Sequence, residues 1–345
     1  MIGEFAFTPS VFDEAANSDA ELWREQLREL GNAMFPRTAA WPVMVANLYA
    51  GSWHRIAMET ARAVQEDRAR KLCQGILDNI GKTLVHRPVA GGDWPDDGGI
   101  AWGREALASH SAEPIDRIVC CRVVYTTLAG ERQPVRCIDE VQAGGFWSEI
   151  SNQWSQEMNI ASQMAAIRKI ALHADFLCLV TPHIRGMGND ETDFAVEMIR
   201  LALRRPAEFH SPEIEVHAEG PEKPASEDFA QRLTNVVSNT SKALRRALDI
   251  GQSVRLVLWP KLLDRYLIAG VYTETSGGKR LRSPRWGIAM SHIARRIDTC
   301  ETKAPTSWSL VSRSQLGDLF DRFGTGAPSG MLHDAAITGC EVRHP

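Results

Sequence analysis

The stretch that decides the fold is DFLCLVTP, residues 175–182, in which five consecutive apolar residues end at a Thr-Pro pair. A short, uniformly apolar run closed by proline is typical of a strand buried on both faces. The next segment, DETDFAVEMIRLALRR (190–205), begins with acids and ends with arginines, the charge order that a helix dipole favours. EIEVHA (213–218), a helical pattern over 226–250 and VRLVLW (254–259) continue the alternation. The succession predicts an α/β fold with a mixed, mostly parallel sheet between helices.

The first part of the chain has a different pattern. Residues 20–35 and 53–82 place apolar side chains at helical spacing, with charges between them. We therefore expect residues 1–90 to form a helical N-terminal domain.

A boundary between domains is expected next. RPVAGGDWPDDGGI (87–100) concentrates glycine, proline and aspartate, which are turn residues, and predicts a linker over residues 91–116. RIVCCRVVYTTL (117–128) is rich in β-branched residues and is predicted to be a strand. The α/β domain is therefore expected to cover residues 117–345.

The composition is that of a soluble globular protein. Of 345 residues, 44% are hydrophobic and 24% are charged, which suffices for about two domains without disulfides or a metal. The N-terminal sequence lacks a basic start followed by an apolar stretch, and no run approaches the ~18 apolar residues of a spanning helix. Seven cysteines occur without a C-x-x-C pair. We expect a cytoplasmic protein with no membrane span, no metal and no cofactor.

Charge is distributed unevenly along the chain. Residues 241–300 hold twelve Lys or Arg against four Asp or Glu, whereas residues 1–60 hold four bases against eight acids. GGKRLRSPRWG (277–287) is the most basic local feature, and its glycines predict a turn whose amides can approach phosphate. Two interpretations remain open: an anion-binding face, or solvated surfaces and an interface with an acidic neighbour.

The segment KLLDRYLIAG (261–270) resembles part of a known family. Leu263-Asp264-Arg265 stands before an apolar run, Gly277-Gly278 follows it, and Thr181-Pro182-His183 follows an earlier strand. With the order of elements over residues 145–325, these features resemble the phospholipase D-like superfamily, in particular the divergent branch typified by the C-terminal domain of MIT-domain proteins. The resemblance implies an α/β sandwich.

Catalytic members of that superfamily, as the resemblance implies, use one histidine to attack phosphorus and a second to protonate the leaving oxygen. Here Leu263 stands where a histidine is expected, and no H-x-K occurs in the chain. Leucine can neither attack nor transfer a proton, so the hydrolytic machinery is expected to be missing. The resemblance further implies a setting in membrane remodelling or in prokaryotic defence against phage, and the second suits this chain better.

Two roles are open for the Asp-Arg pair. Asp264 and Arg265 are expected to form a structural ion pair that fixes a strand against a helix. Alternatively, Arg265 contributes to an anion-binding face. The residues predicted for that face are Arg265, Lys279, Arg280, Arg282, Arg285 and Trp286.

The sequence thus favours a non-catalytic binding or assembly subunit. Its expected ligand is a nucleic acid or another phosphate-bearing polyanion, and its expected partner is another protein or a second copy of the chain. The alternative is a phosphodiesterase or nuclease in which His183, His217 or His292 replaces the lost nucleophile. A metal or acid/base site built from His173, Asp175, His183 and His217 is a weaker hypothesis.

Overall fold

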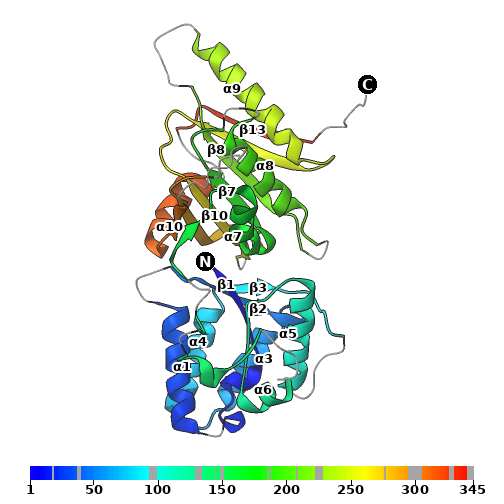
Figure 1. The fold of residues 1–345 in the computed structure, drawn as a ribbon, viewed down its shortest axis with the longest axis vertical. Helices are drawn as coiled ribbons and strands as arrows, with labels where there is room; N and C mark the ends of the chain where they lie inside the picture. Colours follow the sequence, from blue (N-terminus) through cyan, green and yellow to red (C-terminus); the bar gives the residue numbers. More distant parts are fainter. Residues whose placement is uncertain are drawn as a thin grey trace. The chain divides into compact units, whose positions relative to one another are not determined.

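A computed structural model shows two compact units, Met1–Asn152 and Gln153–Pro345 (Figure 1). The structure describes residues 1–17, 19–36, 40–92, 99–128, 134–143, 145–147, 151–184, 186, 188–206, 209–221, 228–275, 277–293, 305–325 and 330–339.

The first unit is built on a five-stranded parallel sheet of order β3-β2-β1-β4-β5. Its strands are β1 (Gly3–Phe7), β2 (Val43–Asn47), β3 (Leu84–His86), β4 (Arg117–Cys120) and β5 (Val135–Cys137). Its helices are α1 (Ala20–Met34), α2 (Leu48–Gly51), α3 (Trp53–Ala63), α4 (Asp67–Ile80), α5 (Ile100–Ala112) and α6 (Arg122–Leu128). Figure 1 shows α1 and α4 on one side of these strands and α5 and α6 on the other. Right-handed crossovers produce this arrangement when the strand order reverses at β1.

This unit corrects the predicted domain organisation. Residues 1–90 contain three strands besides helices, and the predicted linker over 91–116 contains helix α5. The boundary between units lies after Asn152 instead. The strands were missed because each has only three to five residues, too few for a clear period.

A buried ion pair fixes the centre of the first sheet. Glu4 on β1 accepts from Nε and Nη2 of Arg87 at 2.8 and 2.6 Å, and both side chains are buried. Arg87 also donates to the carbonyl oxygen of Glu113 at 3.0 Å. Because Glu4 interrupts the apolar run of β1, its charge made the strand harder to predict from the sequence.

The second unit is built on an eight-stranded sheet of order β13-β9-β8-β7-β10-β11-β12-β6. Its strands are β6 (Gln153–Gln156), β7 (Phe176–Val180), β8 (Glu213–Glu219), β9 (Ser253–Trp259), β10 (Tyr266–Glu274), β11 (Arg280–Met290), β12 (Thr306–Leu310) and β13 (His333–Thr338). The α/β class is confirmed and the sheet is mixed. However, only β7–β8 and β8–β9 pair in parallel, so its antiparallel pairings outnumber the parallel ones.

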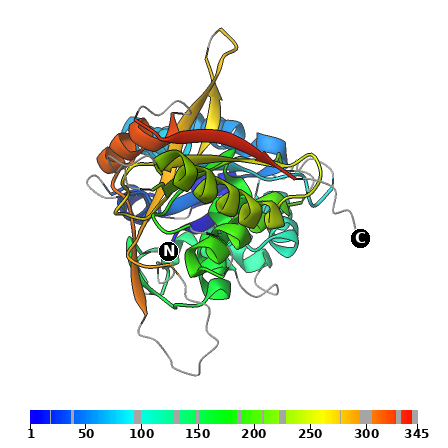
Figure 2. The ribbon, with the colours of Figure 1, turned by 90° about the horizontal axis from the view of Figure 1, so that it is seen from above.

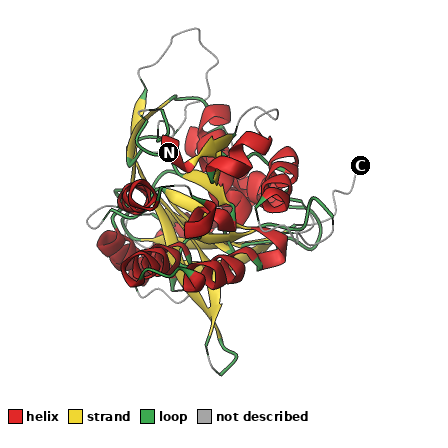
Figure 3. Cartoon of the chain, turned by 90° about the horizontal axis from the view of Figure 1, so that it is seen from below, coloured by secondary structure: helices red, strands yellow, loops and turns green. Residues whose placement is uncertain are grey.

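Helices cover both faces of this sheet. The helices are α7 (Ile160–His173), α8 (Asp190–Leu203), α9 (Phe229–Leu244) and α10 (Arg313–Leu319), followed by the π-helical turn η5 (Phe320–Gly324). Leu316 and Phe323 pack with Cys178 and Val180, the side chains on one face of β7. The alternate residues of β7 face the other layer, where α8 contacts both α7 and α9. The β10–β11 hairpin projects from the sheet (Figures 2 and 3).

Candidate anion-binding sites

The Asp264-Arg265 pair lies in the irregular segment just before β10, not within a strand. Arg265 donates from Nε and Nη2 to Oε1 of Glu191 at 2.9 and 2.6 Å. Asp264 is exposed; burial of Tyr266 and the nearby Asp264 carboxylate together raise the pKa of the Tyr266 hydroxyl. The predicted ion pair between Asp264 and Arg265 is therefore wrong. Arg265 does fasten a strand to a helix, but the acid comes from α8.

Glu191 connects the start of α8 to two neighbouring segments. The N-cap residue Asn189 accepts from the Glu191 amide at 3.0 Å and so begins the helix. The Glu191 carboxylate accepts from the Thr181 hydroxyl and, at 3.0 Å, from the His183 amide. Since the same carboxylate also holds Arg265, the charge of Arg265 is already compensated within the fold.

A polar cavity of about 330 Å³ adjoins this segment. Tyr266, Ala289 and Ser309 are cross-strand neighbours on β10, β11 and β12 and form part of its wall. The other lining residues are Leu263, Asp264, Arg265, Met290, Ser291 and Ser307. Hydroxyl groups dominate the polar lining, and its arginine is paired, so the cavity suits a neutral polar ligand better than a phosphate.

The β10–β11 hairpin carries five of the six residues predicted for an anion-binding face. Lys279 and Arg280 lie at its tip and are exposed. The Arg280 guanidinium stacks 4.3 Å from the ring centroid of Tyr272 on the opposite strand. These two side chains are the exposed cations of the hairpin.

The remaining hairpin residues do not form one exposed face with them. Trp286 is only 3% exposed and belongs to the core. Arg285 lies where the pairing of β10 with β11 shifts register, and burial lowers its pKa. Arg282 points into the unit and pairs with acids of β8. The structure therefore separates the six predicted residues and leaves two at the tip.

Arg282 belongs to a buried charge network centred on Glu215. Glu215 Oε1 accepts from Arg282 Nη2 at 2.9 Å and from Arg255 Nη1 at 3.0 Å. Arg282 also pairs with Glu213 at 2.6 Å, and Arg255 pairs with Asp334. Burial opposes ionisation of Glu215, but hydrogen bonds from His217 and Arg282 lower its pKa to about 2. The network links β8, β9, β11 and β13.

Three potential metal ligands meet beside this network. Cys178, Glu215 and His217 bring one ligand atom each within 4.8 Å of the others, and all three are buried. However, the indole N–H of Trp259 donates to Nδ1 of His217 at 2.9 Å, so the proton of the neutral imidazole lies on Nε2, facing Glu215 at 3.4 Å. A metal at Nε2 would need that proton on Nδ1, where Trp259 already donates. Arg282 beside Glu215 also disfavours a cation.

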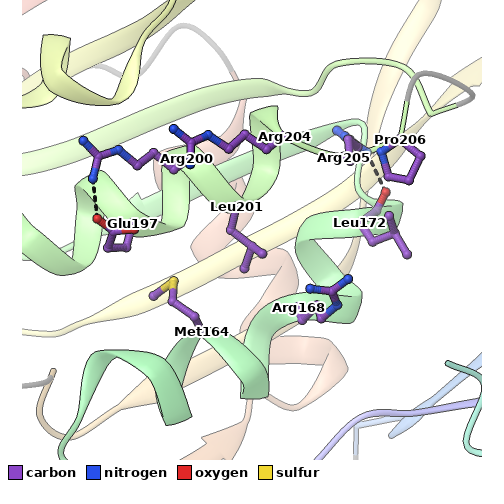
Figure 4. A pocket seen from close by; sticks show the side chains of 9 residues that line it. All are labelled: Met164, Arg168, Leu172, Glu197, Arg200, Leu201, Arg204, Arg205 and Pro206. Carbon is purple, nitrogen blue, oxygen red and sulfur yellow. Dashed lines mark hydrogen bonds and ion pairs between the residues drawn. The ribbon is translucent and has the colours of Figure 1, made fainter. Parts of the chain in front are cut away.

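An arginine-lined groove of about 330 Å³ lies between α7 and α8 (Figure 4). From α7 it is lined by Met164, Arg168 and Leu172, and from α8 and the residues after it by Glu197, Arg200, Leu201, Arg204, Arg205 and Pro206. Within each helix these residues lie three or four positions apart, which places them on one helical face. The groove therefore combines four arginines with one glutamate.

Arg205 and Arg200 have structural roles within the second unit. Arg205 donates to the carbonyl oxygens of Leu172 and Ala174 at 2.7 and 2.9 Å and so satisfies the C-terminal end of α7. Burial lowers the pKa of Arg205 to about 10. Arg200 pairs with Glu197 and donates to the carbonyl oxygen of Arg246 at 2.8 Å.

Arg168 lines the groove from α7, and Arg204 lines it from the residues just after α8. Arg204 is exposed, and within the part of the chain that the structure describes its guanidinium has no hydrogen-bond or ion-pair partner. Arg168 is exposed on α7. The sequence attributed the arginines at the end of α8 to the helix dipole. The four-residue spacing of Arg200 and Arg204 signalled a common face, but nothing in the sequence placed Arg168 opposite them.

The histidines proposed for a rearranged active site differ in burial. His217 is 0% exposed and held by Trp259 and Glu215. His183 and His292 are exposed, yet neither lines the polar cavity or the arginine groove.

Comparisons with known proteins give little further information. No protein-family model matches the chain, and no curated protein matches it. The crystal structure of polyphosphate kinase from Porphyromonas gingivalis is similar over 92% of this chain at 9% identity, with a TM-score of 0.25. The chain spans 45% of the length of that kinase chain. A TM-score this low establishes neither a shared fold nor a shared activity. Within the described residues, every helix is too short or too polar to cross a membrane.

Proposed function

We propose that the chain is a non-catalytic binding subunit that engages an anionic ligand through the arginine groove of its second unit. The observation that carries this proposal is the lining of the groove, in which arginines from two helices face one cavity. Among the described lining residues, four guanidinium groups against one carboxylate give a formal charge of +3. Guanidinium groups stay charged at any physiological pH and bind carboxylate or phosphate in a bidentate manner.

The chemistry of the lining favours binding over catalysis. Among the described lining residues, Glu197 is the one side chain that could act as a nucleophile or a proton carrier, and its carboxylate is paired with Arg200. Arginine is too basic to transfer protons near neutral pH. The described side chains are therefore better suited to holding a charge than to breaking a bond.

The setting of such a subunit stays a prediction. A protein partner or a second copy of the chain, a cytoplasmic location and a part in prokaryotic defence against phage are all compatible with an anion-binding α/β unit. A degenerate phospholipase D-like origin would explain binding of phosphate groups without their hydrolysis.

Charge reversal in the groove tests the proposal. We expect the double variant Arg168→Glu and Arg204→Glu to leave immobilised heparin at a lower salt concentration than the parent, because two contacts are lost and two repulsions are added. The matched control is Lys279→Glu with Arg280→Glu, which makes the same charge change at the hairpin tip. If only the control variant lost retention on heparin, the anion-binding site would lie at the tip of the hairpin and not in the groove. Unchanged retention of both would reject anion binding.

The enzymatic alternative has a separate test. Turnover of a model phosphodiester by the purified chain, abolished by His183→Ala or His292→Ala, would replace the binding proposal with a hydrolase.

A further inference from the structure

We infer that the arginine groove takes an acidic protein segment that carries an aliphatic anchor, not a nucleic acid. This inference rests on the proposed function and names the class of ligand. It begins from the floor of the groove, where Met164 and Leu201 are half-buried between the two helices (Figure 4). Leu172 and Pro206 also line the groove and add to its apolar surface.

A bare phosphate is recognised through charge and hydrogen bonds, so its binding would bury no apolar area of Met164 and Leu201. An aliphatic side chain that enters the groove removes apolar area of Met164 and Leu201 from water, which is favourable. The walls then place Arg168 on one side and Arg204 on the other, where carboxylates flanking that side chain can meet them. A segment with an anchor between acids matches both features.

Single-stranded nucleic acid fits less well. Proteins bind it by stacking bases on aromatic rings along a basic track. None of the nine lining residues that the structure describes is aromatic. The volume of about 330 Å³ also lies at the small end for ligand pockets and suits one side chain with its neighbours. Charge and shape therefore favour a peptide.

The full chain and three probes test the inference by fluorescence anisotropy. The first probe is a labelled peptide in which two leucines are flanked by glutamates. The second is the same peptide with glutamine in place of leucine, which keeps the charge, and the third is oligothymidylate of equal charge. We expect the leucine peptide to bind about tenfold more tightly than its glutamine twin and than the oligonucleotide, the effect of burying about one leucine side chain.

Variants separate the two features of the groove. Arg204→Glu should weaken the leucine peptide at least tenfold. Leu201→Gln, which keeps the side-chain size and suits a helix, should bring the affinity for the leucine peptide down to that for its twin. Arg62→Glu, an exposed arginine in the last turn of α3, is the matched control and should change nothing. Melting temperatures of all variants identify any change caused by misfolding.

The outcomes distinguish this inference from the proposed function. Equal binding of both peptides, weakened by Arg204→Glu, would overturn the aliphatic anchor while the anion-binding groove stands. Tighter binding of the oligonucleotide would identify a nucleic-acid site instead. Binding of no probe, or binding insensitive to Arg204→Glu, would overturn both.

Discussion

Replacing Glu215 by glutamine removes one negative charge from between two arginines and keeps the size of the side chain. Glu215 is 2% exposed, and Arg255 and Arg282 both lie within 3.0 Å of its Oε1. Breaking a buried pair on one side costs about 3–5 kcal/mol. Asp334 and Glu213 still compensate the two arginines, so we expect a loss near the lower value, about 3 kcal/mol of the free energy of unfolding.

The pKa of Glu215 gives a second route to the same magnitude. Its pKa falls from 4.5 to about 2 on folding, and each unit corresponds to about 1.4 kcal/mol, which gives roughly 3 kcal/mol. A depressed pKa contributes stability above the unfolded value, and that contribution disappears as the pH falls through the folded value. The difference in the free energy of unfolding between the parent and Glu215→Gln should therefore reach its full value at pH 7. It should shrink as the pH falls from about 4.5 to about 2.

Hydrogen exchange of β8 and β9 peptides in the full chain measures this loss, because the two units need not unfold together. Glu213→Gln is the matched control, since Glu213 lies on the same strand and pairs with the same Arg282, but its side chain is 58% exposed. Exposed pairs contribute about 0–1 kcal/mol. Equal losses in the two variants, or a loss for Glu215→Gln that persists unchanged at low pH, would refute the reasoning.

Four further substitutions test the geometry of the second unit. Arg265→Ala should lower the free energy of unfolding by about 1–3 kcal/mol because it leaves the Glu191 carboxylate underpaired, whereas Asp264→Ala should change it by less than about 0.5 kcal/mol; urea titration would contradict this if the order were reversed. Trp286→Ala should cost about 3–5 kcal/mol through the cavity that it leaves, and an unchanged melting temperature would show that the indole is not in the core. Gly270→Ala should destabilise the hairpin, since its Cβ would lie 2.1 Å from the carbonyl oxygen of Ser283; wild-type exchange rates in β10 and β11 would refute that clash.

The second unit was the more predictable one because β7 is uniformly apolar, β8 alternates and β9 is mostly apolar. Residues 175–180, 213–218 and 254–259 were identified from these patterns and correspond to β7, β8 and β9. The antiparallel majority was not predictable from them, because it depends on how β10 and β11 pair and on the shorter strands β6, β12 and β13. Trp154 illustrates the difficulty: it lies in the four-residue strand β6, which is too short to show a clear period.

Binding sites were harder to predict than helices and strands. The sequence does not distinguish an arginine that is free to bind a ligand from one that is paired with an acid of the same fold. Arg282 and Arg280 belong to one sequence motif, yet one reaches Glu215 and the other stacks on Tyr272 in the hairpin. Their partners come from pairings across the sheet that the sequence does not specify. That Arg168 and Arg204 line one groove likewise follows from the packing of two helices.

Each sheet draws all of its strands from one continuous stretch of chain, with the change from one to the other between Asn152 and Gln153. If the chain were expressed as two polypeptides divided at that junction, all strand pairings of each sheet would lie within one polypeptide. The two halves can therefore be made as independent polypeptides, and mixing them would reveal whether they recognise each other without a covalent tether.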